Sequence, residues 1–195
     1  MKKTAKGKIL VIMLTLVLCW LGTAGAETGT ATGNGALSAN ARLNFQITIP
    51  KFIIFRVGTD GAGNIDTVLF DPAATDVANA TAGFGATGGT GTVAVSIISN
   101  GGQVTLQEAN NGGGNGLSDG GTNYISYAQI NTADSAGSIT PPTLSDAGSN
   151  TVTVTPTTGV VTIRNDTWTY TYDNPATPPA PGTYTGQVTY TASVP

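Results

Sequence analysis

The sequence predicts an all-β protein, a β-sandwich of about nine or ten short strands with no substantial helix outside an N-terminal signal peptide. Several segments alternate apolar and polar residues with a period of two, which is the pattern of strands with one buried face. Thr and Gly are abundant and charged residues make up only 10% of the chain, and β-branched and Gly residues disfavour helices. Turn-forming Gly, Asn and Pro residues separate the segments, as in a sandwich of short strands.

Residues 1–26 have the features of a secretory signal peptide: a basic start, the apolar run Ile9–Leu21 and small residues at Ala24 and Ala26. We expect cleavage before Glu27, which would leave a secreted chain of residues 27–195. Lipid attachment at Cys19 is the alternative, which the large Leu18 before it disfavours. The apolar run is too short for a comfortable membrane span, and no other span is expected after cleavage.

The first part of the mature chain divides into two segments. Residues 27–36 have no apolar periodicity, so we expect a flexible leader. Residues 37–49 then alternate without interruption up to Pro50, and they predict a strand whose apolar face consists of Leu37, Ala39, Ala41, Leu43, Phe45, Ile47 and Ile49. Such a strand can pair within its own domain or add to the exposed sheet edge of another molecule. The alternation alone leaves both possibilities open.

Residues 37–195 are expected to form a single sandwich domain. After Pro50, residues 51–57 are apolar on both faces, as in a central strand that is fully covered. A turn and a returning strand at 65–71 follow, and 72–91 is read as a loop. Alternating Val and Ile residues around an Asn-Gly-Gly turn predict a β-hairpin over 92–107. Further strands are expected at 124–130, 151–155, 160–163, 167–173 and 183–194.

Composition excludes several classes of function. Cleavage of the signal leaves four basic residues against eleven acidic ones, a net charge of −7, which does not suit nucleic acid or anionic lipid. The mature chain also lacks Cys and His, so Ser–His–Asp and Cys–His catalysis and His- or Cys-based zinc sites are excluded. Its carboxylates stand singly in turns and loops. We therefore expect neither an enzyme nor a protein that holds a metal or another cofactor.

Two alternatives to a purely structural role remain open. Trp168, Tyr170 and Tyr172 share one strand face; this spacing favours a buried core position, but exposed aromatics there could stack on sugars in a carbohydrate-binding or adhesive module. A calcium-stabilised sandwich of a surface layer is the other alternative. It would use the loops at 60–66 and 113–119, which are better explained as turns.

The last segment, "PGTYTGQVTYTASVP" (181–195), resembles the C-terminal strand of immunoglobulin-like fimbrial subunits assembled by the chaperone–usher pathway. Residues 37–49 occupy the place of the alternating N-terminal extension in those subunits. The resemblance implies an immunoglobulin-like sandwich that serves as a structural subunit of an extracellular fimbria and polymerises by donating residues 37–49. The implied partners are copies of the chain or related subunits, a periplasmic chaperone and an outer-membrane usher.

Overall fold

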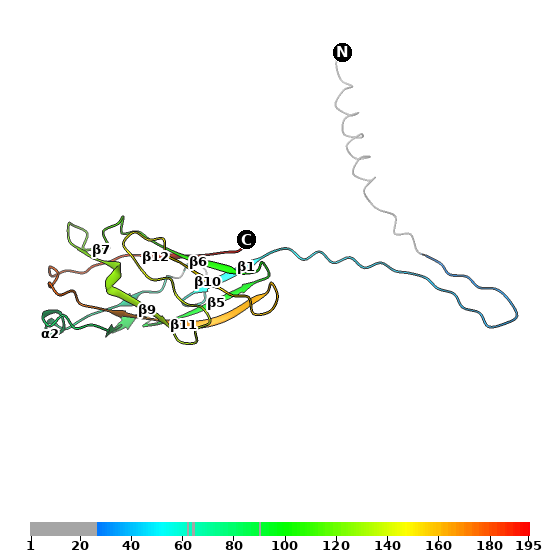
Figure 1. Cartoon of the computed structure of the whole chain (residues 1–195), viewed down its shortest axis with the longest axis horizontal. Helices are drawn as coiled ribbons and strands as arrows, with labels where there is room; N and C mark the ends of the chain where they lie inside the picture. The colour runs from blue at the N-terminus through cyan, green and yellow to red at the C-terminus, as the bar shows by residue number, and fades with distance from the viewer. Residues whose placement is uncertain (1–26, 62, 64, 90) are drawn as a thin grey trace, which may run out of the picture. The chain divides into compact units, whose positions relative to one another are not determined.

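The computed structural model describes residues 27–61, 63, 65–89 and 91–195. The predicted signal peptide, residues 1–26, lies outside them. The chain divides into two compact units, one ending at Ile49 and one spanning Pro50–Pro195, and every strand belongs to the second (Figure 1). Within the described ranges, the helices are the five-residue α2 (Ala74–Ala78) and the 3₁₀ turn η1 (Tyr127–Gln129). The all-β prediction is confirmed.

The first main sheet is antiparallel and is centred on two long strands. These are β5 (Thr92–Ser99) and β11 (Thr162–Tyr172), which pair along most of their lengths. Strand β1 (Ile53–Val57) pairs with the other side of β5, whereas β9 (Ile130–Asp134) and the short β3 (Phe84–Gly85) pair with β11. This sheet therefore has the order β1-β5-β11, and β1 forms one edge.

The second main sheet has three antiparallel strands: β10 (Thr151–Val154), β6 (Val104–Asn110) and β12 (Val188–Ser193), with β6 in the middle. Figure 1 shows the two sheets as layers. In chain order β1, β5, β6, β9, β11 and β12 are arranged like strands A to F of an immunoglobulin sandwich, whereas β10, between β9 and β11 in the chain, is an additional strand on the other side of β6. Two minor ladders join β2 (Val68–Leu69) with β4 (Gly88–Gly89), and β7 (Leu117–Ser118) with β8 (Tyr124–Ile125).

The core lies between the two sheets and is formed by alternate residues of their central strands. Val95 and Ile97 of β5 and Leu106 of β6 are buried, and each such side chain stabilises the fold by about 1.5–3 kcal/mol. Trp168 of β11 fills the centre. Its indole N–H donates to the Ile139 carbonyl at 2.6 Å, and its ring meets the edge of Tyr190 at 4.9 Å between centroids.

A buried carboxylate fixes the connection after β9. Asp166 lies in the middle of β11, and it accepts backbone hydrogen bonds from Ile139, Thr167, Ser138, Ala136 and Ser135 at 2.8–3.2 Å, together with the Ser135 and Ser138 hydroxyls. Desolvation opposes its ionisation, but the backbone N–H groups outweigh it and hold the pKa of the carboxyl well below its usual range. Asp166 therefore anchors the 135–139 loop to β11.

Three of the strand predictions are wrong in their pairing or position. The strands of the 92–107 hairpin exist as β5 and β6, but they pair with other strands in different sheets, because the turn between them carries the chain across the core. Strand β1, predicted as central within 51–57, is an edge strand with Ile54 57% exposed. The segments 160–163 and 167–173 overlap the single strand β11, which continues through the polar stretch between them because that stretch contains the buried anchor Asp166.

The remaining expectations are met only in part. Of the returning strand at 65–71, only β2 is found, and it pairs with β4 in the predicted loop and not with β1. That loop also contains α2. In the 124–130 segment, β8 is followed by the η1 turn before β9 begins. The strands expected at 151–155 and 183–194 appear as β10 and β12.

Replacing Glu108 by Gln is expected to raise the free energy of unfolding by about 1 kcal/mol. Glu108 faces the core from β6 and is fully buried; Oε1 accepts from Ser149 N–H at 3.2 Å, but Oε2 has no hydrogen-bond partner among the described residues. Gln keeps the shape and the acceptor while removing a charge that is costly to desolvate. Urea unfolding of both proteins at neutral pH measures the difference, and a less stable variant would contradict the prediction.

Candidate functional site

One side of the sandwich has two free strand edges next to each other. Strand β1 is hydrogen-bonded to β5 alone and β12 to β6 alone, and in the described part of the chain no further strand pairs with either. The two edge strands lie in contact with each other. An immunoglobulin sandwich has a further strand, G, beside strand F, which is the place next to β12. We call the side between β1 and β12 the acceptor flank.

The side chains that face inward at the acceptor flank are only partly buried. They pack against the core from both edge strands: Ile53, Phe55 and Val57 from β1, and Tyr190, Ala192 and Val194 from the β12 segment. By contrast, Ile97 and Leu106 on the central strands are 0% exposed. The apolar interior is thus less well covered along this flank, where one more strand with an apolar face would complete the burial.

The inward-facing side chains of the acceptor flank that pack against the core are all uncharged. The largest side chain there is Tyr190, whose hydroxyl lies 3.2 Å from that of Tyr170, and either group can donate to the other. Desolvation raises the pKa of the Tyr190 phenol far above its usual value, and the neighbouring Tyr170 raises it further. The phenol therefore stays uncharged at physiological pH, and the flank is suited to an apolar partner.

The predicted strand 37–49 is not part of either sheet. It has no regular secondary structure, and its large apolar side chains are exposed: Leu37 55%, Leu43 76%, Phe45 85%, Ile47 85% and Ile49 74%. Ala39 and Ala41 are exposed as well. Arg42 pairs with Glu27 at 2.9 Å, so the leader folds back along the segment. All seven residues proposed to bind a partner therefore lie on an uncovered apolar face.

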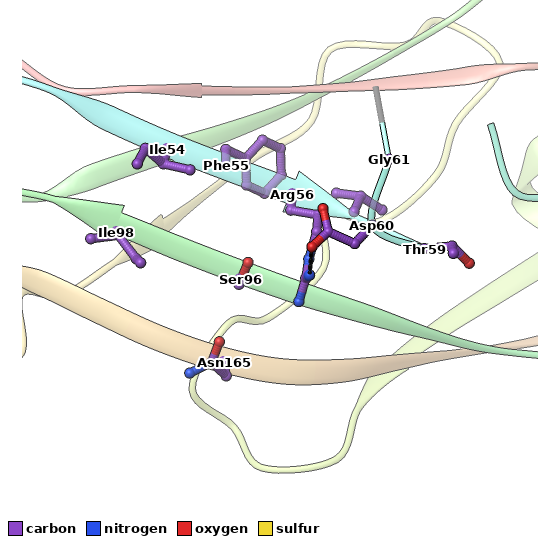
Figure 2. Close-up of a pocket in the computed structure, with 10 residues that line it drawn as sticks. Ile54, Phe55, Arg56, Thr59, Asp60, Gly61, Ser96, Ile98 and Asn165 are labelled. Carbon is purple, nitrogen blue, oxygen red and sulfur yellow. Dashed lines mark ion pairs between the residues drawn. The ribbon is translucent and has the colours of Figure 1, made fainter. Parts of the chain in front are cut away.

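A second feature is an open depression of about 620 Å³ on the outer face of β1, β5 and β11 (Figure 2). Ile98 of β5 lies in register with Ile54 of β1, and both line the depression. Beside them Arg56 forms an ion pair with Asp60 at 3.3 Å. Asp60 supplies the single carboxylate among the residues that line the depression, and this carboxylate is already paired with the Arg56 guanidinium. The depression therefore does not suit acid–base catalysis of the kind that uses two carboxylates.

The possible ligand-stacking residues are in the core. Trp168, Tyr170 and Tyr172 are 0%, 8% and 7% exposed, so the carbohydrate-stacking interpretation of these three residues is corrected in favour of the core one. A sugar ring cannot reach aromatic side chains that are buried to this extent.

The loops considered for calcium contain turns. Asp66 accepts from the backbone N–H and the hydroxyl of Thr59. The Asn123 side chain and the Gly121 N–H hold the pKa of Asp119 below its usual value. In the described ranges, no group of three or more His, Cys, Asp and Glu residues could hold a metal ion.

No protein-family model matches the chain, and no curated protein is significantly similar to it. The fold defines the class as an all-β sandwich. Among the residues that the structure describes, no helix is both long and apolar enough to cross a membrane.

Sequence reasoning identified the alternating segment 37–49 but neither its exposure nor the surface that could receive a strand. The alternation of Tyr190, Ala192 and Val194 was visible, whereas the edge position of β12 was not. For β1 the signal was misleading, because Ile54 and Phe55 are both apolar although Ile54 points outward. Whether a strand is an edge depends on its neighbours in space, and no local pattern reports this.

Proposed function

We propose that this chain is a structural subunit of an extracellular fibre and polymerises by strand donation. Residues 37–49 of one copy add as a strand to the acceptor flank of the next copy. The observation that carries the proposal is the coexistence of an exposed segment of alternating apolar residues with a sandwich whose two sheet edges, β1 and β12, leave the core partly uncovered.

The chemistry of the two surfaces is complementary. Strand addition pairs backbone N–H and C=O groups along a free edge, and alternate side chains enter the interior. The five large apolar residues of the segment would contribute on the order of 10 kcal/mol if fully buried, before the cost of ordering the segment. This is enough for a long-lived non-covalent contact.

The proposal extends to the route of assembly. A subunit with an uncovered core and an exposed apolar strand is prone to aggregation before it meets the next copy. A periplasmic chaperone that covers the flank and an outer-membrane usher are the partners we propose for export to the cell surface. Copies of the chain or related subunits would then form the fibre.

The test is gel electrophoresis of the mature chain, residues 27–195, in SDS with and without heating. We expect a ladder of oligomers that resists SDS and collapses on heating. Phe45→Asp places a charge on the apolar face of the segment and is expected to abolish the ladder.

Asn44→Asp is the matched control, because it introduces the same charge one residue away on the opposite face. It is expected to leave the ladder unchanged. A mature chain that stays monomeric at all concentrations, or two variants that assemble equally well, would refute strand donation by this segment.

A further inference from the structure

Residues 37–49 could also insert into the acceptor flank of their own molecule, and this self-insertion would compete with strand donation between copies. The segment is joined to β1 of its own domain through only Pro50, Lys51 and Phe52. A binding element on a short tether has an effective concentration in the millimolar range if the geometry permits binding, and near zero if it does not. At micromolar subunit concentrations, self-insertion would therefore win by roughly a thousandfold unless the connection prevents it.

The connection is held in an extended conformation by Asn100, which follows β5. Asn100 Oδ1 accepts from Phe52 N–H at 2.8 Å, and Asn100 Nδ2 donates to the Pro50 carbonyl at 2.8 Å. The Ser99 hydroxyl and the Asn100 N–H donate to the Phe52 carbonyl at 2.9 and 3.4 Å. These bonds continue the β1–β5 ladder beyond its last paired residues, Ile53 and Ser99, so Pro50–Phe52 prolong the edge strand.

A second hydrogen bond joins the connection Pro50–Phe52 to the end of the other edge strand, β12. The Lys51 ammonium donates to the carbonyl of Pro195, just beyond β12, at 2.6 Å. Figure 1 shows the C-terminus at the end of the domain where β1 begins. Lys51 therefore bridges the two edge strands at the end of the acceptor flank where the chain enters the domain.

Self-insertion is incompatible with this arrangement. To run back along the free edge of β1, the chain would have to reverse within Pro50–Phe52, as in a three-residue hairpin loop. The Asn100 bonds hold both ends of this connection straight. The ring of Pro50 also restricts Ile49 to extended backbone.

We propose that Asn100 and Lys51 form an entry clamp that keeps the segment out of its own domain and so makes strand donation intermolecular. This inference rests on the proposed function and deepens it. The clamp determines the partner of the acceptor flank, which is a second copy of the chain. Asn100 acts through the backbone of Pro50 and Phe52 and is a positioning residue.

The first test replaces Asn100 by Ala in the mature chain and compares the monomer fraction by size-exclusion chromatography at micromolar concentration. We expect at least a tenfold rise in a compact monomer whose fraction does not depend on protein concentration. Amide hydrogen exchange should show residues 37–49 protected in that monomer, which simple loss of folding would not produce. Asn115→Ala, at an exposed position in a remote loop, is the matched control and should assemble as the unmodified chain does.

The second test leaves the clamp intact and bypasses it. Insertion of Gly-Ser-Gly-Gly between Ile49 and Pro50 adds flexible residues in which the chain can reverse direction before it reaches the clamp. This variant should therefore also form the monomer in which residues 37–49 are protected. If the unmodified chain polymerises and the insertion variant does so equally, the clamp is refuted while strand donation stands. If the unmodified chain is itself a monomer with residues 37–49 protected, both the clamp and the proposed function are wrong.

Discussion

A peptide with the sequence of residues 37–49 is expected to raise the free energy of unfolding of the mature Phe45→Asp chain by about 2.7 kcal/mol when present at roughly a hundred times its dissociation constant. The variant is not expected to donate its own strand, and the inward side chains of its acceptor flank, such as Tyr190 and Ala192, are only partly buried. A ligand that binds only the folded state stabilises it by mass action. Urea unfolding measures the change through the fluorescence of Trp168, the only Trp in residues 27–195.

The control is the same peptide with Phe45→Asp, which keeps the length and the polar face but loses the largest apolar side chain. This control peptide should leave the urea unfolding midpoint of the Phe45→Asp chain nearly unchanged. The cause is burial: each large apolar residue that enters the flank contributes about 1.5–3 kcal/mol, and a carboxylate at the same position would have to be desolvated. Equal stabilisation by the two peptides would show that binding does not use the apolar face.

Replacing Asp166 by Ala is expected to cost about 3–5 kcal/mol of unfolding free energy. Its carboxylate accepts hydrogen bonds from Ser138, Ile139 and neighbouring groups of the 135–139 loop. Removal leaves several buried N–H groups unpaired, and each costs about 1–3 kcal/mol. A domain of this size has only about 5–15 kcal/mol in total, so the variant should be close to unfolding at 37 °C.

The same carboxylate makes stability depend on pH in a defined direction. Its pKa in the folded chain lies well below the ordinary value of 3.8. The stabilisation is therefore complete above pH 3.8 and is lost as the pH falls below it. Asp166→Asn, which cannot ionise, should show a smaller drop in stability between pH 5 and pH 3, read from urea midpoints.

Asp60→Asn is the matched control for Asp166, because Asp60 has a mostly exposed side chain in a surface ion pair with Arg56. Such pairs contribute about 0–1 kcal/mol. If the two Asn variants lost the same stability at neutral pH, the role of Asp166 as the anchor of the 135–139 loop would be wrong.

The strands themselves were largely readable from local patterns. Val93, Val95 and Ile97 alternate, and they form the buried face of β5. Trp168 and Tyr170 were predicted to belong to the core, and both do. These predictions succeed because the direction of a strand side chain follows from its position in the chain alone.

The pairings could not be read in this way. The turn after Ser99 was read as the tip of a hairpin, but it carries the chain to the other sheet, because Ile97 and Leu106 face each other across a shared core. Asp166 stands in a polar stretch and was read as part of a turn. Its role comes from a loop about 30 residues away in sequence that supplies its donors.

By itself, the sequence determined that this is an all-β chain with an uninterrupted apolar face on residues 37–49, since periodicity is a property of neighbouring residues. The tertiary structure alone decided that β1 and β12 are edges, that their inward side chains are partly uncovered, and that Asn100 holds the entry to β1. Those features depend on which distant segments come together, because hydrogen-bond partners and burial are set by contacts far apart in the chain.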